Sequence, residues 1–230
     1  MKNTLKINKI IKPFNESIHV DGDKSISIRW ALLASQAIGT SRAYKLLKSE
    51  DVLSTLKCLK KLGVKIKFNN QYCEVIGRGL GGYNYKKNLT LDAGNSGTLG
   101  RLVLGLLLNS TQKIKLIGDK SLSKRDFSRV TEPLQKFGAK FHSKKGSKLP
   151  LTIMGLKYTI PINYTEDKGS AQCKSSIMLA ALNTNGETFI KAKKSRNHTE
   201  LFFKYLKIPI KIKKTKEYDY IRIVGKKKFK

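Results

Sequence analysis

The chain repeats one order of segments three times, and this repetition limits its possible folds more than any other feature. Each copy begins with a short polar cluster and an apolar helical run. A strand, a second polar cluster and a second helix follow, and alternating strands close the copy at a glycine. The closing glycines are Gly77, Gly155 and Gly225. A repeat of roughly 75 residues is a supersecondary unit rather than one turn of a solenoid.

Each copy is predicted to form a β-α-β-α-β-β unit. In the first copy we expect Ser25 to cap a helix over residues 26–37. Leucines at every third position predict a second helix that stops at Gly63, and residues 64–68 and 72–76 alternate as a hairpin does. Three such units predict an α/β (α+β) domain with pseudo-threefold symmetry, with its helices inside and its sheets outside.

The other two copies follow the same order. In the second, Pro133 is expected in the first turn of a helix, where its missing N–H has no cost. The third is predicted to begin with a strand over 159–162, to replace the glycine stop of its second helix by Ile208-Pro209, and to end in strands over 210–212 and 220–224.

The chain is strongly basic, with 47 Lys and Arg against 16 Asp and Glu and a formal net charge of +31. Such a charge favours anionic partners, which include nucleic acid, a membrane surface or a phosphorylated metabolite. A lysine-rich solvated surface without a partner has the same composition. With 40% hydrophobic residues the chain can bury a core, so it is expected to fold.

The cysteines and the apolar runs indicate in which compartment the chain works and whether it binds zinc or a membrane. Cys58, Cys73 and Cys173 form no close pair, which disfavours a disulfide framework and a zinc site and favours a reducing cytoplasm. Residues 1–14 lack the apolar core of a signal peptide, and the longest apolar run, 102–108, is too short to span a bilayer. We therefore expect no membrane association and no zinc site.

The starts of the predicted helices carry the chemistry. A helix N-terminus has free N–H groups and a partial positive charge, so it attracts anions. Lys24, Ser25 and Arg29 lie at the first such start, and Gly97 would let a ligand approach the backbone of the second. A single serine there is usually only a cap. Three equivalent starts, all polar and two of them strongly basic, indicate a small phosphorylated or carboxylated ligand.

Five motifs, in order, resemble those of the 5-enolpyruvylshikimate-3-phosphate synthase family. The motifs are residues 21–27 with Arg29, residues 91–98 with Arg101-Leu102, Gly118-Asp119 with Ser121-Leu122 and Lys124-Arg125, Ser170-Ala171-Gln172 with Lys174-Ser175, and Ser195-Arg196 with His198-Thr199-Glu200. The resemblance implies transfer of the enolpyruvyl group of phosphoenolpyruvate to the 5-hydroxyl of shikimate 3-phosphate, with release of phosphate. This reaction belongs to the shikimate pathway, which makes chorismate and the aromatic amino acids.

The resemblance also implies two sets of ligand-binding residues. The expected contacts to shikimate 3-phosphate are Lys24, Ser25, Arg29, Ser170, Ala171, Gln172, Ser195 and Arg196. The expected contacts to phosphoenolpyruvate are Lys24, Asn95, Gly97, Arg125 and Gln172. No catalytic residue is expected in this chain, because the family's catalytic carboxylates lie in its other half. The resemblance also implies no metal and no organic cofactor.

The family has two such domains, so this chain is interpreted as an N-terminal half that is inactive alone, whether as a partial sequence or as one part of a split enzyme. Residues 1–14, with a strand over 1–11 that has no partner in the chain, are expected to belong to the missing second domain. Residues 15–226 would form the substrate-binding domain, with repeats at about 17–79, 88–155 and 157–225, and residues 227–230 a truncated linker. The missing C-terminal half is the expected protein partner.

Two other interpretations are kept. The sister transferase that uses UDP-N-acetylglucosamine shares the fold but not the Lys-Ser…Arg and Ser-Ala-Gln signatures. A basic nucleic-acid-binding domain, related in architecture to RNA terminal-phosphate cyclases, is the alternative from another class. Aromatic residues make up only 8% of the chain, and the sequence shows no basic and aromatic stacking surface, which disfavours nucleic acid as a partner.

Overall fold

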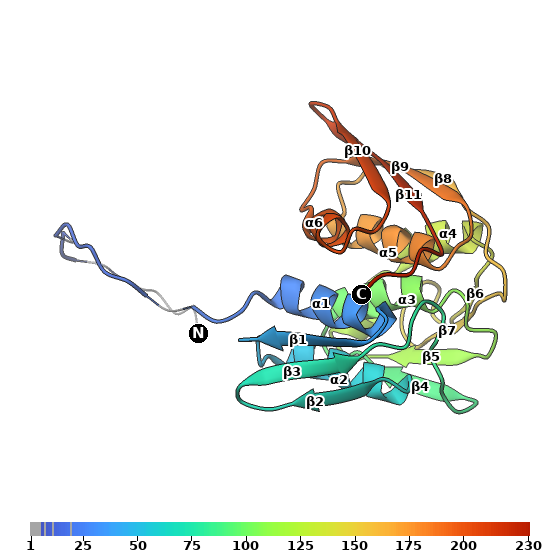
Figure 1. The fold of residues 1–230 in the computed structure, drawn as a ribbon, viewed down its shortest axis with the longest axis horizontal. Helices are drawn as coiled ribbons and strands as arrows, with labels where there is room; N and C mark the ends of the chain where they lie inside the picture. Colours follow the sequence, from blue (N-terminus) through green and yellow to red (C-terminus); the bar gives the residue numbers. More distant parts are fainter. Residues whose placement is uncertain (1–5, 7, 11, 19) are drawn as a thin grey trace.

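The computed structural model describes residues 6, 8–10, 12–18 and 20–230. Its helices are α1 Lys24–Gln36, α2 Glu50–Lys61, α3 Gly97–Leu106, α4 Ser128–Lys136, α5 Ala171–Leu182 and α6 His198–Tyr205, with a 3-10 turn at Leu122–Lys124. Its strands are β1 Thr40–Tyr44, β2 Lys65–Phe68, β3 Tyr72–Ile76, β4 Leu89–Asp92, β5 Ile114–Ile117, β6 Lys140–His142, β7 Leu151–Met154, β8 Asn163–Glu166, β9 Glu187–Lys193, β10 Ile210–Lys214 and β11 Tyr218–Val224. Figure 1 shows the sheets on the outside of the helices.

The strands form three sheets, one from each repeat. The second sheet has the order β4-β5-β7-β6 and the third the order β10-β11-β9-β8. In both, the first strand of the repeat pairs in parallel with the next one, and the remaining pairs are antiparallel. Within the described residues the first sheet has only three strands, in the order β1-β3-β2. Among the described residues, the first repeat therefore shows no leading strand of the predicted β-α-β-α-β-β unit.

The strand predicted over residues 1–11 falls mostly outside the described residues. Residues 6 and 8–10 are described and are not in a strand. At the other end, Phe229 is only 6% exposed, and its carbonyl accepts a hydrogen bond from the N–H of Ile38 at 2.8 Å. The segment predicted as a linker therefore contacts the first repeat as far as Phe229, and the position of the linker remains a prediction.

The first helices of the repeats, α1, α3 and α5, form the core and run parallel. Arg29 near the start of α1 bonds Ser175 near the start of α5, and at the other end Asn183 donates to Gln36 at 3.1 Å. α3 crosses α5 closely at Gly105, where a Cβ would lie 2.2 Å from the carbonyl oxygen of Ser176. These contacts confirm the predicted inner layer of helices with sheets outside.

The closing glycines of the three repeats make the same contact. A Cβ on Gly77 would lie 2.1 Å from the carbonyl oxygen of Ala37, one on Gly155 2.0 Å from that of Leu108, and one on Gly225 1.9 Å from the Thr184 carbonyl oxygen. Each glycine therefore lets the last strand of its repeat pass directly over the end of the first helix. The repetition of these glycines in the sequence thus has a steric cause.

The prediction that Pro133 lies in the first turn of its helix is wrong. It lies in the interior of α4, not in its first turn, so its missing N–H leaves the Arg129 carbonyl without its usual helical donor. The thiol of Cys173 on α5 donates to this carbonyl oxygen at 2.8 Å. A donor from a neighbouring helix thus replaces the lost N–H, which is why the proline is tolerated there.

Two boundaries in the third repeat also differ from expectation. The strand predicted over 159–162 lies instead at Asn163–Glu166, and Pro161, within the predicted range, has no N–H for a sheet ladder. The second helix stops before Ile208-Pro209. Its capping residue Leu206 is followed by Lys207, which adopts a left-handed conformation with φ 53°. Gly63 and Gly138 hold the same place in the other two repeats.

Replacing Lys207 with glycine should therefore stabilise the protein, by up to ~1 kcal/mol, because a left-handed backbone is strained for lysine and free for glycine. Urea unfolding followed by the fluorescence of Trp30 measures this change. The control is Lys204→Gly inside α6, which should be destabilising by about 1 kcal/mol. Equal losses of stability in both variants would contradict the prediction.

Candidate functional site

The starts of α1, α3 and α5 lie at one end of the helical core. Gln172 in the first turn of α5 donates to the Thr98 hydroxyl in the first turn of α3 at 3.1 Å. The caps are Asp23, Ser96 and Ser170, each of which accepts a hydrogen bond from the N–H three residues later. The prediction that Ser25 caps α1 is therefore wrong. Ser25 lies inside the helix, and the Asp23 carboxylate reaches the free N–H instead.

The α3–α5 cluster brings together four of the residues predicted to bind phosphoenolpyruvate. Its members are Asn95, Gly97, Arg101, Arg125 and Gln172. The Arg125 guanidinium donates to the Asn95 side-chain oxygen at 3.4 Å, and a Cβ on Gly97 would lie 3.0 Å from Nη1 of Arg125. Gly97 thus leaves room for two guanidinium groups beside the first turn of α3.

Arg101 belongs to the same cluster, although the sequence motif gave it no predicted ligand-binding role. Its guanidinium donates to Gln172 Oε1 at 3.1 Å and to the Gly97 carbonyl at 3.4 Å, and it lies 5.0 Å from the Phe127 ring centroid. Burial lowers the pKa of Arg101, and the charge of Arg125 lowers it further. The threefold repeat could have indicated this role. Arg29 lies at the corresponding place in the first repeat and likewise donates to the carbonyl of the residue four positions earlier, Ser25.

The α1–α5–α6 cluster surrounds Arg29, which is only 4% exposed. The guanidinium donates to the Thr199 hydroxyl at 2.9 Å, to the Ser175 hydroxyl at 3.1 Å and to the Ser25 carbonyl at 3.1 Å. Burial lowers the pKa of Arg29 to about 10, although the Glu200 carboxylate opposes this effect. Arg29 therefore stays charged at neutral pH and is held by three elements at once.

A buried ion pair lies beside this cluster. The Lys174 ammonium on α5 is 2.6 Å from the Glu200 carboxylate on α6, and their side chains are 0% and 4% exposed. Among the described residues neither group has a further hydrogen-bond partner. Both residues belong to the sequence motifs, but their pairing was not predicted. The local sequence does not show which residues of two different helices come into contact.

The other predicted residues are arranged less tightly. Arg196 is exposed, and its charge is close enough to lower the pKa of Arg29 and of His198, whose pKa falls mainly through burial. The Lys24 ammonium turns away to Asp51 on α2, at 2.8 Å. The Ser195 hydroxyl is buried and has no hydrogen-bond partner within the described chain. Ala171 is half-buried as the first residue of α5.

The described part of the chain holds no group of three or more His, Cys, Asp or Glu side chains suited to a metal ion. Its helices are all too short or too polar to cross a bilayer. The site as described thus consists of helix starts, guanidinium groups, amides and hydroxyls. Such groups bind anions through charge-assisted hydrogen bonds.

Comparison with known proteins adds independent evidence. The family model described as EPSP synthase (3-phosphoshikimate 1-carboxyvinyltransferase) matches residues 8–230. A 3-phosphoshikimate 1-carboxyvinyltransferase of Ruthia magnifica is 44% identical over 212 residues, which are 90% of this chain and 48% of that protein. One of Zymomonas mobilis is 38% identical over 221 residues, 95% of this chain and 48% of that protein.

A solved structure of EPSP synthase from Acinetobacter baumannii superimposes with a TM-score of 0.84 at 33% sequence identity. The match covers 92% of this chain and 48% of that one. The chain therefore spans about half the length of the relatives that it matches.

Proposed function

The chain belongs to the EPSP synthase family, and from that premise we propose that it supplies one wall of the site that transfers the enolpyruvyl group of phosphoenolpyruvate to the 5-hydroxyl of shikimate 3-phosphate. The reaction releases phosphate in the shikimate pathway. Both substrates are small polyanions, which suit a site of helix starts and guanidinium groups.

The observation that carries the proposal is the placement of Gln172 between the starts of two parallel helices. Its side-chain oxygen accepts from Arg101 and its nitrogen donates to Thr98, so the amide is fixed in one orientation. Asn95, Gly97 and Arg125 surround the start of α3. We assign phosphoenolpyruvate to this α3–α5 cluster, where Arg125 would hold an anionic group while Arg101 orients Gln172.

Shikimate 3-phosphate is assigned to the α1–α5–α6 side of the same end. The exposed guanidinium of Arg196 would grip an anionic group directly. Arg29 would contribute a fixed positive charge from below the surface, because three hydrogen bonds already hold it. Ser25, Ser170, Ala171, Gln172 and Ser195 complete the proposed contacts. Lys24 would have to leave Asp51 to reach both substrates.

The acid–base groups are proposed to come from the part of the enzyme that this chain does not span. Two carboxylates near the helix starts are already engaged, Glu200 by Lys174 and Asp51 by Lys24. The proposed protein partner is accordingly the other half of the synthase. We also propose a reducing compartment, the cytoplasm, because Cys58, Cys73 and Cys173 are all free and buried.

Calorimetric titration of the 230-residue chain with shikimate 3-phosphate tests the proposal. Arg196→Ala should weaken binding at least tenfold, because it removes a charge-assisted hydrogen bond from an exposed side chain without disturbing the fold. Arg29 is a poorer probe, since its burial means that its removal would also unfold the helix starts.

The matched control is Lys194→Ala, which removes one exposed positive charge two residues earlier. Its affinity should stay within about twofold of the parent, since screened surface charges contribute little. Equal weakening in both variants, or no binding by the parent, would contradict the assignment. Phosphate release from the two substrates by this chain alone would refute the partial-enzyme proposal.

A further inference from the structure

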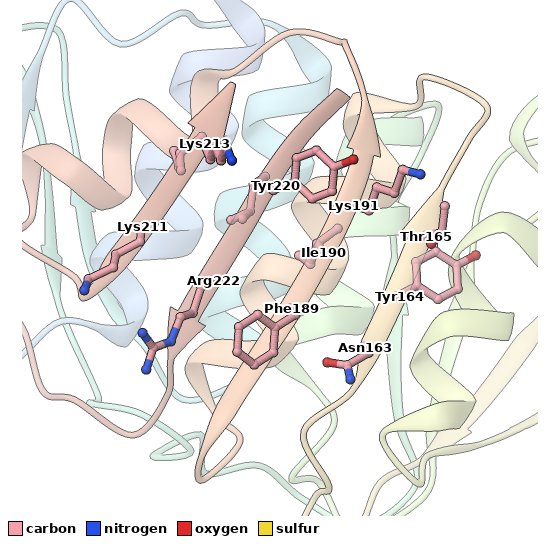
Figure 2. A pocket seen from close by; sticks show the side chains of 12 residues that line it. Asn163, Tyr164, Thr165, Phe189, Ile190, Lys191, Lys211, Lys213, Tyr220 and Arg222 are labelled. Atoms are coloured by element: carbon pink, nitrogen blue, oxygen red, sulfur yellow. The ribbon is translucent and has the colours of Figure 1, made fainter. Parts of the chain in front are cut away.

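The outer face of the third sheet carries a basic and aromatic surface. Six residues make up this surface, which we call the β9–β11 face: Phe189, Lys191, Lys211, Lys213, Tyr220 and Arg222. The antiparallel register places Phe189 opposite Arg222 and Lys191 opposite Tyr220 on the two central strands. Strand β10 then adds Lys211 beside Arg222 and Lys213 beside Tyr220. The two rows are visible in Figure 2.

The rings on this face are open to solvent. Phe189 is 44% and Tyr220 43% exposed, and they line a groove of about 500 Å³. The Arg222 guanidinium lies 5.8 Å from the Phe189 ring centroid, and the Lys191 ammonium lies 6.0 Å from that of Tyr220. Aromatic rings and positive charges therefore alternate across the two central strands.

The charge of this face is almost unopposed. The Arg222 guanidinium donates two hydrogen bonds to the Glu187 carboxylate, and the one from Nε is 2.9 Å long. Within the described chain, no carboxylate forms an ion pair with Lys191, Lys211 or Lys213. The face thus presents these three ammonium groups to solvent on a chain whose net charge is +31. A ligand that is complementary to this face is a flexible polyanion that carries flat apolar groups.

We propose that the β9–β11 face binds single-stranded nucleic acid. Unpaired bases would stack on Phe189 and Tyr220, and the lysines of the edge and central strands would contact the phosphates. The sequence composition gave no sign of such a surface. It arises from the strand register, which places two aromatic residues that are 31 positions apart in the chain on neighbouring strands, with the inward-facing Ile190–Ile221 pair between them.

This chemistry fits single strands better than the other polyanions. A duplex buries its bases in the stack and offers no free ring to Phe189. An anionic membrane would need a continuous set of apolar side chains to enter it, whereas only two of the six residues of this face are aromatic and the other four are basic. The proposed substrate site lies elsewhere, since β9 turns its inner residues Ile190 and Ala192 toward the core that contains α5.

Fluorescence anisotropy with a 5′-labelled oligouridine 20-mer tests the proposal on the 230-residue chain. Phe189→Ala with Tyr220→Ala should raise the dissociation constant at least tenfold, because base stacking is removed, and should leave the salt dependence unchanged. Lys211→Gln with Lys213→Gln should instead flatten the salt dependence, by about 0.7 in log–log slope for each phosphate that the protein no longer neutralises.

Matched controls use exposed residues of the same types elsewhere. The aromatic control is Tyr205→Ala on α6, at a residue that is 83% exposed, and the basic control is Lys57→Gln with Lys60→Gln on α2. Both should leave the affinity for oligouridine within about twofold of the parent. The aromatic variant should keep the circular-dichroism spectrum and melting temperature of the parent, which shows that it is folded.

Three results would overturn the proposal. The first is equal affinity of the parent and the Phe189 and Tyr220 variant for oligouridine, which would reduce binding to general electrostatics. The second is tighter binding of an RNA duplex of equal length. The third is binding to anionic phosphatidylserine vesicles that depends on the two rings, with no such dependence for oligouridine, which would identify a membrane surface instead.

Discussion

Lys174→Met should lower the free energy of unfolding by about 3–5 kcal/mol. The substitution leaves the Glu200 carboxylate buried at 4% side-chain exposure without its positive partner. The loss should be visible in urea unfolding as a lower midpoint with an unchanged slope. The effect should also reach the proposed site, because α6 carries both Glu200 and Thr199, and Thr199 accepts a hydrogen bond from Arg29.

The double variant Lys174→Met with Glu200→Met distinguishes the removal of a pair from the removal of one side chain. Two apolar side chains of similar length should recover most of the stability, because no uncompensated charge remains. As a control, Arg42→Met breaks the exposed ion pair between Arg42 and Glu74 on the first sheet and should cost far less. If Lys174→Met cost no more than Arg42→Met, the buried pair would not hold α6 on α5.

Gly155→Ala should destabilise the protein by about 2–4 kcal/mol. The added methyl group would lie 2.0 Å from the carbonyl oxygen of Leu108, which is backbone and cannot rotate away. The end of β7 would have to move off the end of α3. Calorimetric or circular-dichroism melting measures the effect, and Gly77→Ala and Gly225→Ala should act in the same way because their contacts are equivalent.

Gly146→Ala is the matched control for a glycine without this contact. It has φ 65° and nothing within 4 Å of an added Cβ, so only the cost of a left-handed backbone remains, about 1 kcal/mol. A loss of stability at Gly155 no larger than that at Gly146 would show that the strand ends adapt. In that case the threefold glycine pattern would have no steric explanation.

The architecture could be predicted from local patterns in the sequence. Periodic leucines located α2, and Gly63 and Gly138 marked the stops of two helices. The errors arose where one residue type has several roles. Asp23 and Ser25 are both good caps, and only the backbone conformation decides between them. Pro133 is compatible with a helix interior only because Cys173 of another helix satisfies the freed carbonyl.

The candidate site was likewise predicted only in part. The residues at helix starts were identified from their motifs, and the structure brings Asn95, Gly97, Arg125 and Gln172 together. Arg101 received no role, because a sequence does not show that its guanidinium orients Gln172 across two helices. Lys24 was expected to point to both ligands, yet its ammonium contacts Asp51.

By itself the sequence determined the threefold unit, the order of its elements, the inward faces of its helices and the polar character of the helix starts. These depend on periodicity and on residue types within a few positions of one another. Only the tertiary structure decided that α1, α3 and α5 run parallel, that Lys174 meets Glu200, and that Phe189 and Tyr220 share a basic face. Such contacts join residues far apart in the chain. They are fixed by helix packing and strand register, which depend on all the elements at once.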